Sequence, residues 1–380
     1  MKFSFLILMF FALEQLPAQD NLDLSQKIGK IDSTNIFVSK DYYIWCSSVV
    51  KGDDQKYHLF YSRWKHGVRT DTDDSLNYIF NGFKGWNKYS EIAYAVSDHL
   101  TGPYKPVSTV LKGTGDTSRW DRFTYHNPLI RYYDGFYYLY FISNAFDSSF
   151  TLAKPVAKEY LQWLKYNCTQ KIGVIKAKTI EDLVSGHYAQ PIKCIMAPDN
   201  KQTFEVATNP AVTQGPDGKF YMMYKSRLPN VGHMTFWMAV ADKPDGPFKT
   251  ISSVLSSAEM ACEDPTLWYD KKRRQFYAVA KYFSNAKVLA PEFGALVLIT
   301  SKNGVDWQPA KHPVVSLKEL TYKNGTTIKL ANLERPFIVT DAAGQPVALF
   351  AAAAIKSPFE QTTSEVGAEH NSFNVQISLR

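Results

Sequence analysis

Carboxylates stand one or two residues before proline at two places in the sequence, in Glu263-Asp264-Pro265 and in Glu334-Arg335-Pro336. His126-Asn127-Pro128 and Asn209-Pro210 repeat the pattern with amides in place of the acids. Proline at the start of a strand costs no ladder hydrogen bond and holds the preceding residue extended, so it accounts for a turn. Proline does not account for the charged residues in these two motifs, because charged residues are disfavoured in strands. Carboxylates from separate segments around one pocket are what acid/base cleavage of a glycosidic bond requires.

Each motif opens a repeated unit that consists of an apolar strand, a turn rich in Gly and Asp, and an aromatic strand. Asp-Gly turns suit tight two-strand connections, so each unit predicts a β-hairpin. The equivalent positions at the unit starts are Cys46, Asn127, Asn209, Asp264 and Arg335. The unit recurs five times, at residues 45–64, 125–144, 208–227, 262–283 and 333–353.

The repeats predict an all-β fold, a five-bladed β-propeller with loop and short helical insertions. A further strand follows the hairpin in most units, and a sheet of three or four strands cannot bury both faces alone. Radial stacking around an axis buries both faces, and the innermost strands then begin around one funnel. A β-sandwich would not explain why the same hairpin returns five times. The segment from Ser149 to Cys168 predicts a helical insertion near the pocket rim.

The N-terminus has the three parts of a secretory signal peptide: Lys2, the apolar stretch Phe3 to Leu13, and Leu16-Pro17-Ala18. We therefore expect residues 1–18 to be a signal peptide, residues 19–380 to form a single propeller domain, and the protein to be secreted or periplasmic. No other segment approaches the length of a spanning helix, which predicts no membrane span. The net charge of +7 is spread along the chain and does not indicate a nucleic-acid partner.

The hairpin Asp217 to Tyr221, the strand ends SDHLTGPYK and ADKPDGPFK, and the EDP and ERP openings resemble the five-bladed propeller glycoside hydrolases. That superfamily contains family 43, the invertase and levansucrase families, and family 117. The resemblance implies a blade-one Asp as base or nucleophile, here Asp41. It implies Glu263 as the acid, with Asp264 as the neighbour that tunes its pKa. Glu334 fits either acidic role, and the sequence does not rank it against Glu263.

The sequence also departs from the family pattern. The first unit carries Trp45-Cys46-Ser47 in place of a carboxylate before proline, so Asp41 is either the blade-one carboxylate or a turn residue. Asn209 stands where family 43 places a carboxylate. Either the catalytic roles have moved, or one carboxylate was lost together with activity.

Several further side chains are candidates for substrate binding. His126 suits a hydrogen bond to a sugar hydroxyl, and the apolar face of a sugar suits a tryptophan. Trp45 lies closer to the ring of motifs than Trp86 or Trp120, and is the favoured platform. Basic side chains suit a carboxylate, sulfate or phosphate. The full set of predicted binding residues is Trp45, His126, Asn127, Asn209, Lys225, Arg227, Lys281 and Arg335.

These observations together predict an exported glycoside hydrolase that acts on a poly- or oligosaccharide without an organic cofactor. No metal ligands are assigned, although a structural calcium ion on the axis is compatible with the fold. A glycoside phosphorylase is one alternative, in which the basic residues would hold phosphate. A non-catalytic propeller that binds glycans is another, because of Asn209 and the missing blade-one signature.

Overall fold

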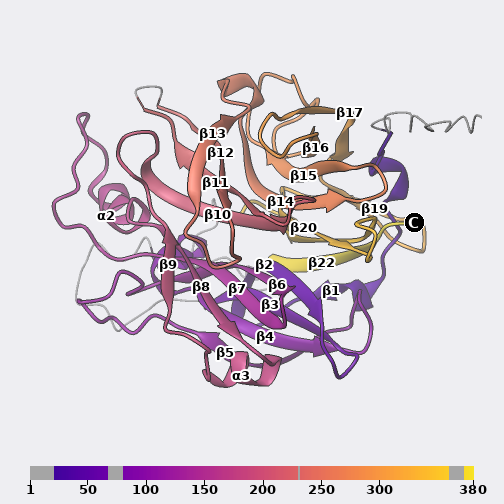
Figure 1. Ribbon diagram of the computed structural model, residues 1–380, viewed down its shortest axis with the longest axis horizontal. Helices are drawn as coiled ribbons and strands as arrows, with labels where there is room; N and C mark the ends of the chain where they lie inside the picture. Colours follow the sequence, from indigo (N-terminus) through magenta and orange to yellow (C-terminus); the bar gives the residue numbers. More distant parts are fainter. Residues whose placement is uncertain (1–20, 67–79, 230–231, 359–371) are drawn as a thin grey trace, which may run out of the picture.

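The computed structural model describes residues 21–66, 80–229, 232–358 and 372–380, and five four-stranded antiparallel sheets form the framework of this part of the chain (Figure 1). The predicted signal peptide, residues 1–18, lies outside the described residues. The innermost strands of neighbouring sheets contact one another around a closed ring: β2 with β6, β6 with β10, β10 with β14, β14 with β20, and β20 with β2. The five-bladed propeller predicted from the repeats is therefore confirmed.

Each of blades one to four takes its strands in chain order, from the innermost to the outermost. Blade one contains β2 (Tyr42–Lys51), β3 (Tyr57–Lys65), β4 (Glu91–Ser97) and β5 (Lys105–Leu111). Blade two contains β6 (Tyr125–Tyr133), β7 (Phe136–Ser143), β8 (Lys171–Ala177) and β9 (Lys193–Met196). Blade three contains β10 (Phe204–Gln214), β11 (Phe220–Arg227), β12 (Met234–Ala241) and β13 (Lys249–Val254). Blade four contains β14 (Cys262–Asp270), β15 (Gln275–Tyr282), β16 (Leu296–Ser301) and β17 (Gln308–Ser316).

Blade five closes the ring with both ends of the described chain. Its inner strands are β20 (Asn332–Thr340), β21 (Pro346–Ala354) and β22 (Ser372–Ser378), and its outermost strand is the N-terminal β1 (Ile36–Phe37). The pairing of Ile36 with Val375 joins the first strand to the last blade, so the ring is held shut by backbone hydrogen bonds.

The cores lie between neighbouring blades, where aromatic and branched side chains of one sheet pack against the next. Buried hydroxyls also tie the innermost strands together. Ser48 Oγ accepts from the Ile130 amide at 2.9 Å, and Thr266 Oγ1 accepts from the Ile338 amide at 3.2 Å. These bonds satisfy backbone donors that have no partner within their own sheet, which fixes the height of one blade against the next.

The helices are insertions between strands. They are α1 (Trp86–Tyr89), α2 (Lys158–Asn167) and α3 (Ile180–Ser185), and α2 confirms the helical insertion predicted from residues 149–168. Two short strands, β18 (Glu319–Thr321) and β19 (Thr327–Lys329), form a hairpin between blades four and five. In the described part of the chain no helix is both long and apolar enough to cross a bilayer.

A bulge interrupts the innermost strand of every blade at the predicted equivalent position. The pairing with the second strand shifts there in all five sheets. The bulged residue has a positive φ in each case: 41° at Cys46, 56° at Asn127, 56° at Asn209, 61° at Asp264 and 53° at Arg335. A positive φ in a residue other than glycine costs on the order of 1–3 kcal/mol, and such strain concentrates at functional sites. Here the bulge turns each side chain toward the axis.

Candidate active site

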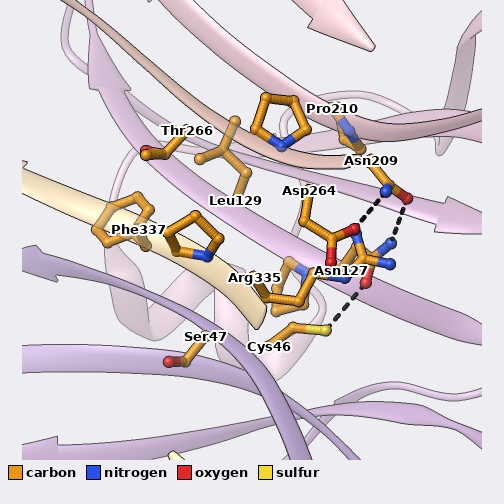
Figure 2. A pocket seen from close by; sticks show the side chains of 13 residues that line it. Cys46, Ser47, Asn127, Leu129, Asn209, Pro210, Asp264, Thr266, Arg335 and Phe337 are labelled. Atoms are coloured by element: carbon orange, nitrogen blue, oxygen red, sulfur yellow. Dashed lines mark hydrogen bonds and ion pairs between the residues drawn. The ribbon is translucent and has the colours of Figure 1, made fainter. Parts of the chain in front are cut away.

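The five bulged side chains meet on the axis and line a small cavity of about 370 Å³ (Figure 2). Asp264 is the only carboxylate among them. Its Oδ1 accepts from Asn209 Nδ2 at 2.5 Å and lies 3.0 Å from Arg335 Nη1. Residues that are far apart in the sequence thus form one hydrogen-bonded cluster because the same bulge recurs in every blade.

The Asn127 amide links this cluster to His126. As drawn in Figure 2, its Oδ1 accepts from Cys46 Sγ at 3.0 Å and its Nδ2 donates to Asn209 Oδ1 at 3.2 Å. With oxygen and nitrogen exchanged, the oxygen accepts from Arg335 Nη1 and Nη2 at 2.8 and 3.0 Å, and the nitrogen donates to His126 Nε2 at 3.2 Å. We assign the second orientation because the first sets two N–H donors against each other.

A larger cavity of about 770 Å³ opens beside the cluster and is walled differently on its sides. Aromatic side chains from blade one and from the insertions that contain α1 and α2 form one wall. Charged side chains from blades three, four and five form another. The lining residues are Trp45, Phe83, Trp86, His126, Trp163, Asn167, Gln170, Val206, Thr208, Asn209, Lys225, Met234, Glu263, Asp264, Glu334 and Arg335.

Two lysines hold the acidic residues of the charged wall. Glu263 Oε2 lies 2.7 Å from Lys225 Nζ, and Glu263 Oε1 lies 2.8 Å from Lys281 Nζ. The same Lys281 ammonium also pairs with Glu334 Oε1, which accepts a second bond from Asn332 Nδ2 at 2.9 Å. With Asp264 and Arg335, the site holds three carboxylates and three cations, so its formal charge is zero.

The pKa directions of the two adjacent acids are opposite. Burial raises the pKa of Glu263, but the ammonium groups of Lys225 and Lys281 outweigh burial and hold that pKa well below its usual range. Burial raises the pKa of Asp264 to about 6, although the Arg335 guanidinium acts in the other direction. Of the two adjacent acids, Asp264 therefore has the raised pKa and Glu263 the lowered one. The sequence-based roles of Glu263 as acid and Asp264 as its modulator stay a prediction.

The three acids also differ in which oxygens are free. Both carboxylate oxygens of Glu263 are bound to lysine ammonium groups. The known partners of Asp264 all contact Oδ1, and those of Glu334 all contact Oε1. Within the described residues, Asp264 Oδ2 and Glu334 Oε2 thus have no hydrogen-bond partner, and both residues line the cavity. These two oxygens are available to a bound molecule.

The aromatic wall is supported from behind. His126 stacks on Trp86 with a centroid distance of 4.9 Å, and its Nδ1 lies 2.8 Å from Ser90 Oγ. Burial, with the Arg335 charge as a smaller cause, holds the pKa of His126 well below its usual value, so the ring is neutral. Its Nδ1 then carries the proton and donates to Ser90, while Nε2 accepts from Asn127. His126 therefore acts here as a support for Trp86 and Asn127.

Helix α2 brings Trp163 to the same wall. Trp163 meets Trp86 edge to face at 6.0 Å, and its carbonyl accepts from Asn87 Nδ2 at 3.0 Å. Trp86 was a secondary candidate in the sequence and Trp163 was not singled out. The sequence feature that could have identified Trp163 is its position inside an insertion that is expected at the pocket rim. Trp120, the third tryptophan considered, stacks on Phe141 and lines neither cavity.

The structure brings most of the predicted site residues together, and places two elsewhere. Asp41 is exposed at the start of β2 and lines neither cavity, so the predicted blade-one carboxylate does not reach the other acids. The bulge of blade one presents Cys46 instead. Arg227 also lies outside both cavities, and its Nε is 2.8 Å from Glu205 Oε2. The remaining predicted residues line the cavities or pair with residues that do: Trp45, His126, Asn127, Asn209, Lys225, Glu263, Asp264, Lys281, Glu334 and Arg335.

Cys46 is the thiol nearest to this chemistry. Burial raises its pKa to about 12, so it is protonated and is not a nucleophile. In the described ranges no group of three His, Cys, Asp or Glu side chains is arranged to hold a metal ion. The structural calcium ion considered from the sequence stays a prediction.

No protein-family model matches the sequence, and no curated protein sequence does. Solved structures do match. A family 117 glycoside hydrolase from the marine bacterium Zobellia galactanivorans is 16% identical, with 93% of this chain and 88% of that chain covered and a TM-score of 0.55. The α-L-arabinofuranosidase from Lactobacillus brevis is 12% identical, with coverages of 90% and 92% and a TM-score of 0.54.

A protein of unknown function from Dyadobacter fermentans is also similar, at 12% identity, with 93% of this chain and 100% of that chain covered and a TM-score of 0.55. At these identities the similarity concerns the fold. This chain has the five-bladed propeller fold that these glycoside hydrolases have, over nearly its whole length.

Proposed function

We propose that this protein is a glycoside hydrolase in which Asp264 is the general acid and Glu334 is the base or nucleophile. The observation that carries the proposal is that these are the two carboxylates with a free oxygen at the cavity, beside an aromatic wall suited to a sugar. A glycosidase needs one protonated and one ionised carboxyl group. The raised pKa of Asp264 supports the first role, and the ammonium of Lys281 on Glu334 supports the second.

Glu263 has a different role in this proposal. Because both its oxygens are bound to lysines, it holds the ammonium groups of Lys225 and Lys281 in place and keeps Lys281 against Glu334. Glu263 is therefore a positioning residue. The Asn209 and Arg335 side chains fix Oδ1 of Asp264, which directs Oδ2 away from them and toward the cavity.

The test is a screen of plant and algal oligosaccharides for release of reducing sugar, in the presence and absence of phosphate. We expect turnover that does not depend on phosphate. Asp264→Asn and Glu334→Gln should each reduce kcat by at least about a hundredfold, the scale of acid/base catalysis. Asp41→Asn is the matched control, because Asp41 is exposed and away from the cavity, and it should retain wild-type turnover. Loss of turnover in Asp41→Asn with retention in Asp264→Asn would reject this assignment.

The second candidate function is glycan binding without catalysis. It is favoured by Cys46, which occupies the bulge where blade one would otherwise present a carboxylate to the axis. Binding of an oligosaccharide that persists without product release would support it. Phosphorolysis has less support, since Lys225, Lys281 and Arg335 are each paired with a carboxylate of the site. Product formation that requires phosphate would reverse that ranking.

We also propose that the protein is exported, on the strength of the predicted signal peptide. Determining the N-terminal residue of the mature protein tests this, and a first residue near position 19 is the expected result.

A further inference from the structure

The propeller has a second large cavity, of about 1100 Å³, at the opposite end of its axis. The active-site cavity is built from the starts of the innermost strands, whereas this one is built from their later halves. Its lining residues from these strands are Val49, Val50, Lys51, Ile130, Arg131, Tyr132, Tyr133, Thr213, Leu267, Trp268, Phe337, Ile338, Val339 and Thr340. Phe337 also lines the small axial cavity, so it marks the boundary between the two ends.

The charged lining of this second cavity is entirely positive. It contains Lys51 and Arg131, and none of its described lining residues is Asp or Glu. Arg131 lies over the Phe337 ring, with its guanidinium carbon 4.8 Å from the ring centroid. Its Nε donates to the Val212 carbonyl at 3.2 Å, and its Nη2 is 3.5 Å from the Leu267 carbonyl. The guanidinium also makes a side-chain hydrogen bond with Tyr133, and no carboxylate of the described residues contacts it.

Arg131 differs in this respect from several other cations around the blades. Arg63, Arg119 and Arg273 each pair with a carboxylate, and so do Lys176, Lys225, Lys281 and Arg335. Within the described residues, the partners of Arg131 are carbonyl oxygens, the Phe337 ring and the Tyr133 side chain, and none is a carboxylate. Burial accordingly lowers its pKa, which means that the protein bears the desolvation cost of this charge without a counter-ion. An anion that binds in the cavity would offset that cost.

The aromatic side chains that line this cavity suit a sugar ring. Tyr132 is 51% exposed, and Tyr57, Tyr133 and Trp268 line the same cavity. Aromatic side chains of this kind pack against the apolar faces of sugars. A guanidinium that is not paired with a carboxylate of its own protein recognises a compact oxyanion such as a carboxylate or sulfate group.

We propose that this cavity is a second binding site, for an anionic sugar unit that carries a carboxylate or a sulfate ester, with Arg131 as the anion-binding group. The site is independent of the catalytic proposal, because it shares no charged residue with the active-site cavity. A protein that binds such a sugar without turnover, or turns over a substrate without binding one here, would separate the two proposals.

The experiment is calorimetric titration of the full-length mature protein with glucuronate, glucose 6-sulfate and glucose at low ionic strength. We expect both anions, or one of them, to bind at least tenfold more tightly than glucose, and the comparison of the two identifies the preferred anion. Arg131→Met should reduce the affinity for the anion at least tenfold. Lys225→Met should leave it unchanged, since Lys225 faces the other cavity. An affinity lost in Lys225→Met and retained in Arg131→Met would place the anion in the active site and overturn the proposal.

A purely structural role for Arg131 predicts a different result. Arg131→Met should keep or raise the thermal midpoint of unfolding of the unliganded protein, because it removes a charge that lacks a counter-ion. A large fall in that midpoint would indicate that Arg131 stabilises the fold, and it would count against the proposal. Tyr132→Ala alters an exposed side chain and tests the ring contact without that risk. It should weaken binding several-fold, and binding equal to wild type in both variants would overturn the proposal.

Discussion

The two ends of the propeller axis handle buried charge in opposite ways. At the active-site end, three carboxylates and three cations are paired across blades three, four and five. At the other end, Arg131 is held by carbonyl oxygens, Tyr133 and the Phe337 ring, and no carboxylate of the described residues pairs with it. A strained bulge presents the side chains at the first end, whereas β6 pairs in register with β7 from Leu129 to Tyr133 toward the second.

This difference indicates what each end is suited to bind. A paired network with zero formal charge suits a neutral sugar. A cavity with an unpaired cation and several tyrosines accommodates an anion. The five bulged residues with left-handed backbone lie at the first end, which supports the proposal of catalysis there.

The largest expected effect is on stability, and it separates the two ends. Lys281→Met leaves Glu263 and Glu334 buried without their shared ammonium, so we expect a loss of about 3–5 kcal/mol in the free energy of unfolding. Arg131→Met removes a charge that has no counter-ion and should change that free energy by about 1 kcal/mol or less. Urea denaturation of both variants measures the contrast. Equal losses would show that the two ends do not differ in this way.

The pH dependence of turnover sharpens the assignment at the active-site end. A general acid works in its protonated form, and the pKa of Asp264 is raised to about 6. The protonated fraction therefore falls through pH 6, and kcat should decrease about tenfold for each pH unit above it. Lys225 and Lys281 hold the pKa of Glu263 low, so Glu263 stays ionised throughout this range. Glu263 therefore does not cause a decrease of kcat with pH. A rate that is constant from pH 6 to 8 would exclude Asp264 as the acid.

The smallest expected effect concerns the aromatic wall. Trp163→Ala removes one side of the wall without touching the carboxylates, so KM should rise about tenfold while kcat changes little. Trp120→Ala is the matched control. It removes a tryptophan that packs on Phe141 away from the cavity, and KM should stay at the wild-type value. A fall in kcat with unchanged KM in Trp163→Ala would contradict a binding role.

The sequence predicted the fold and much of the site because both depend on repetition. Five copies of one hairpin predict five blades, and the xP motifs mark the same position in each blade. The bulge itself was not predicted, since nothing in Cys46-Ser47 or Asn209-Pro210 specifies a positive φ. That bulge selects Cys46 for the axis and leaves Asp41 at the surface.

The roles of the acids depended on geometry that one sequence does not contain. Lys225 lies on the second strand of blade three, and its reach to Glu263 follows from the packing of neighbouring blades. Lys281 lies directly opposite Glu263 on the second strand of blade four. Glu263 and Asp264 are adjacent in the chain, yet one meets two ammonium groups and the other a guanidinium and an amide. Their pKa values shift in opposite directions for that reason. Their adjacency in the sequence does not indicate which of the two pKa values is raised.

The central claim is that Asp264 donates a proton to the leaving group. The most direct measurement compares Asp264→Asn on the natural oligosaccharide and on a dinitrophenyl glycoside of the same sugar, whose leaving group needs no proton. We predict that kcat/KM falls at least about a hundredfold more on the oligosaccharide than on the dinitrophenyl glycoside. Equal losses on the two substrates would contradict the claim.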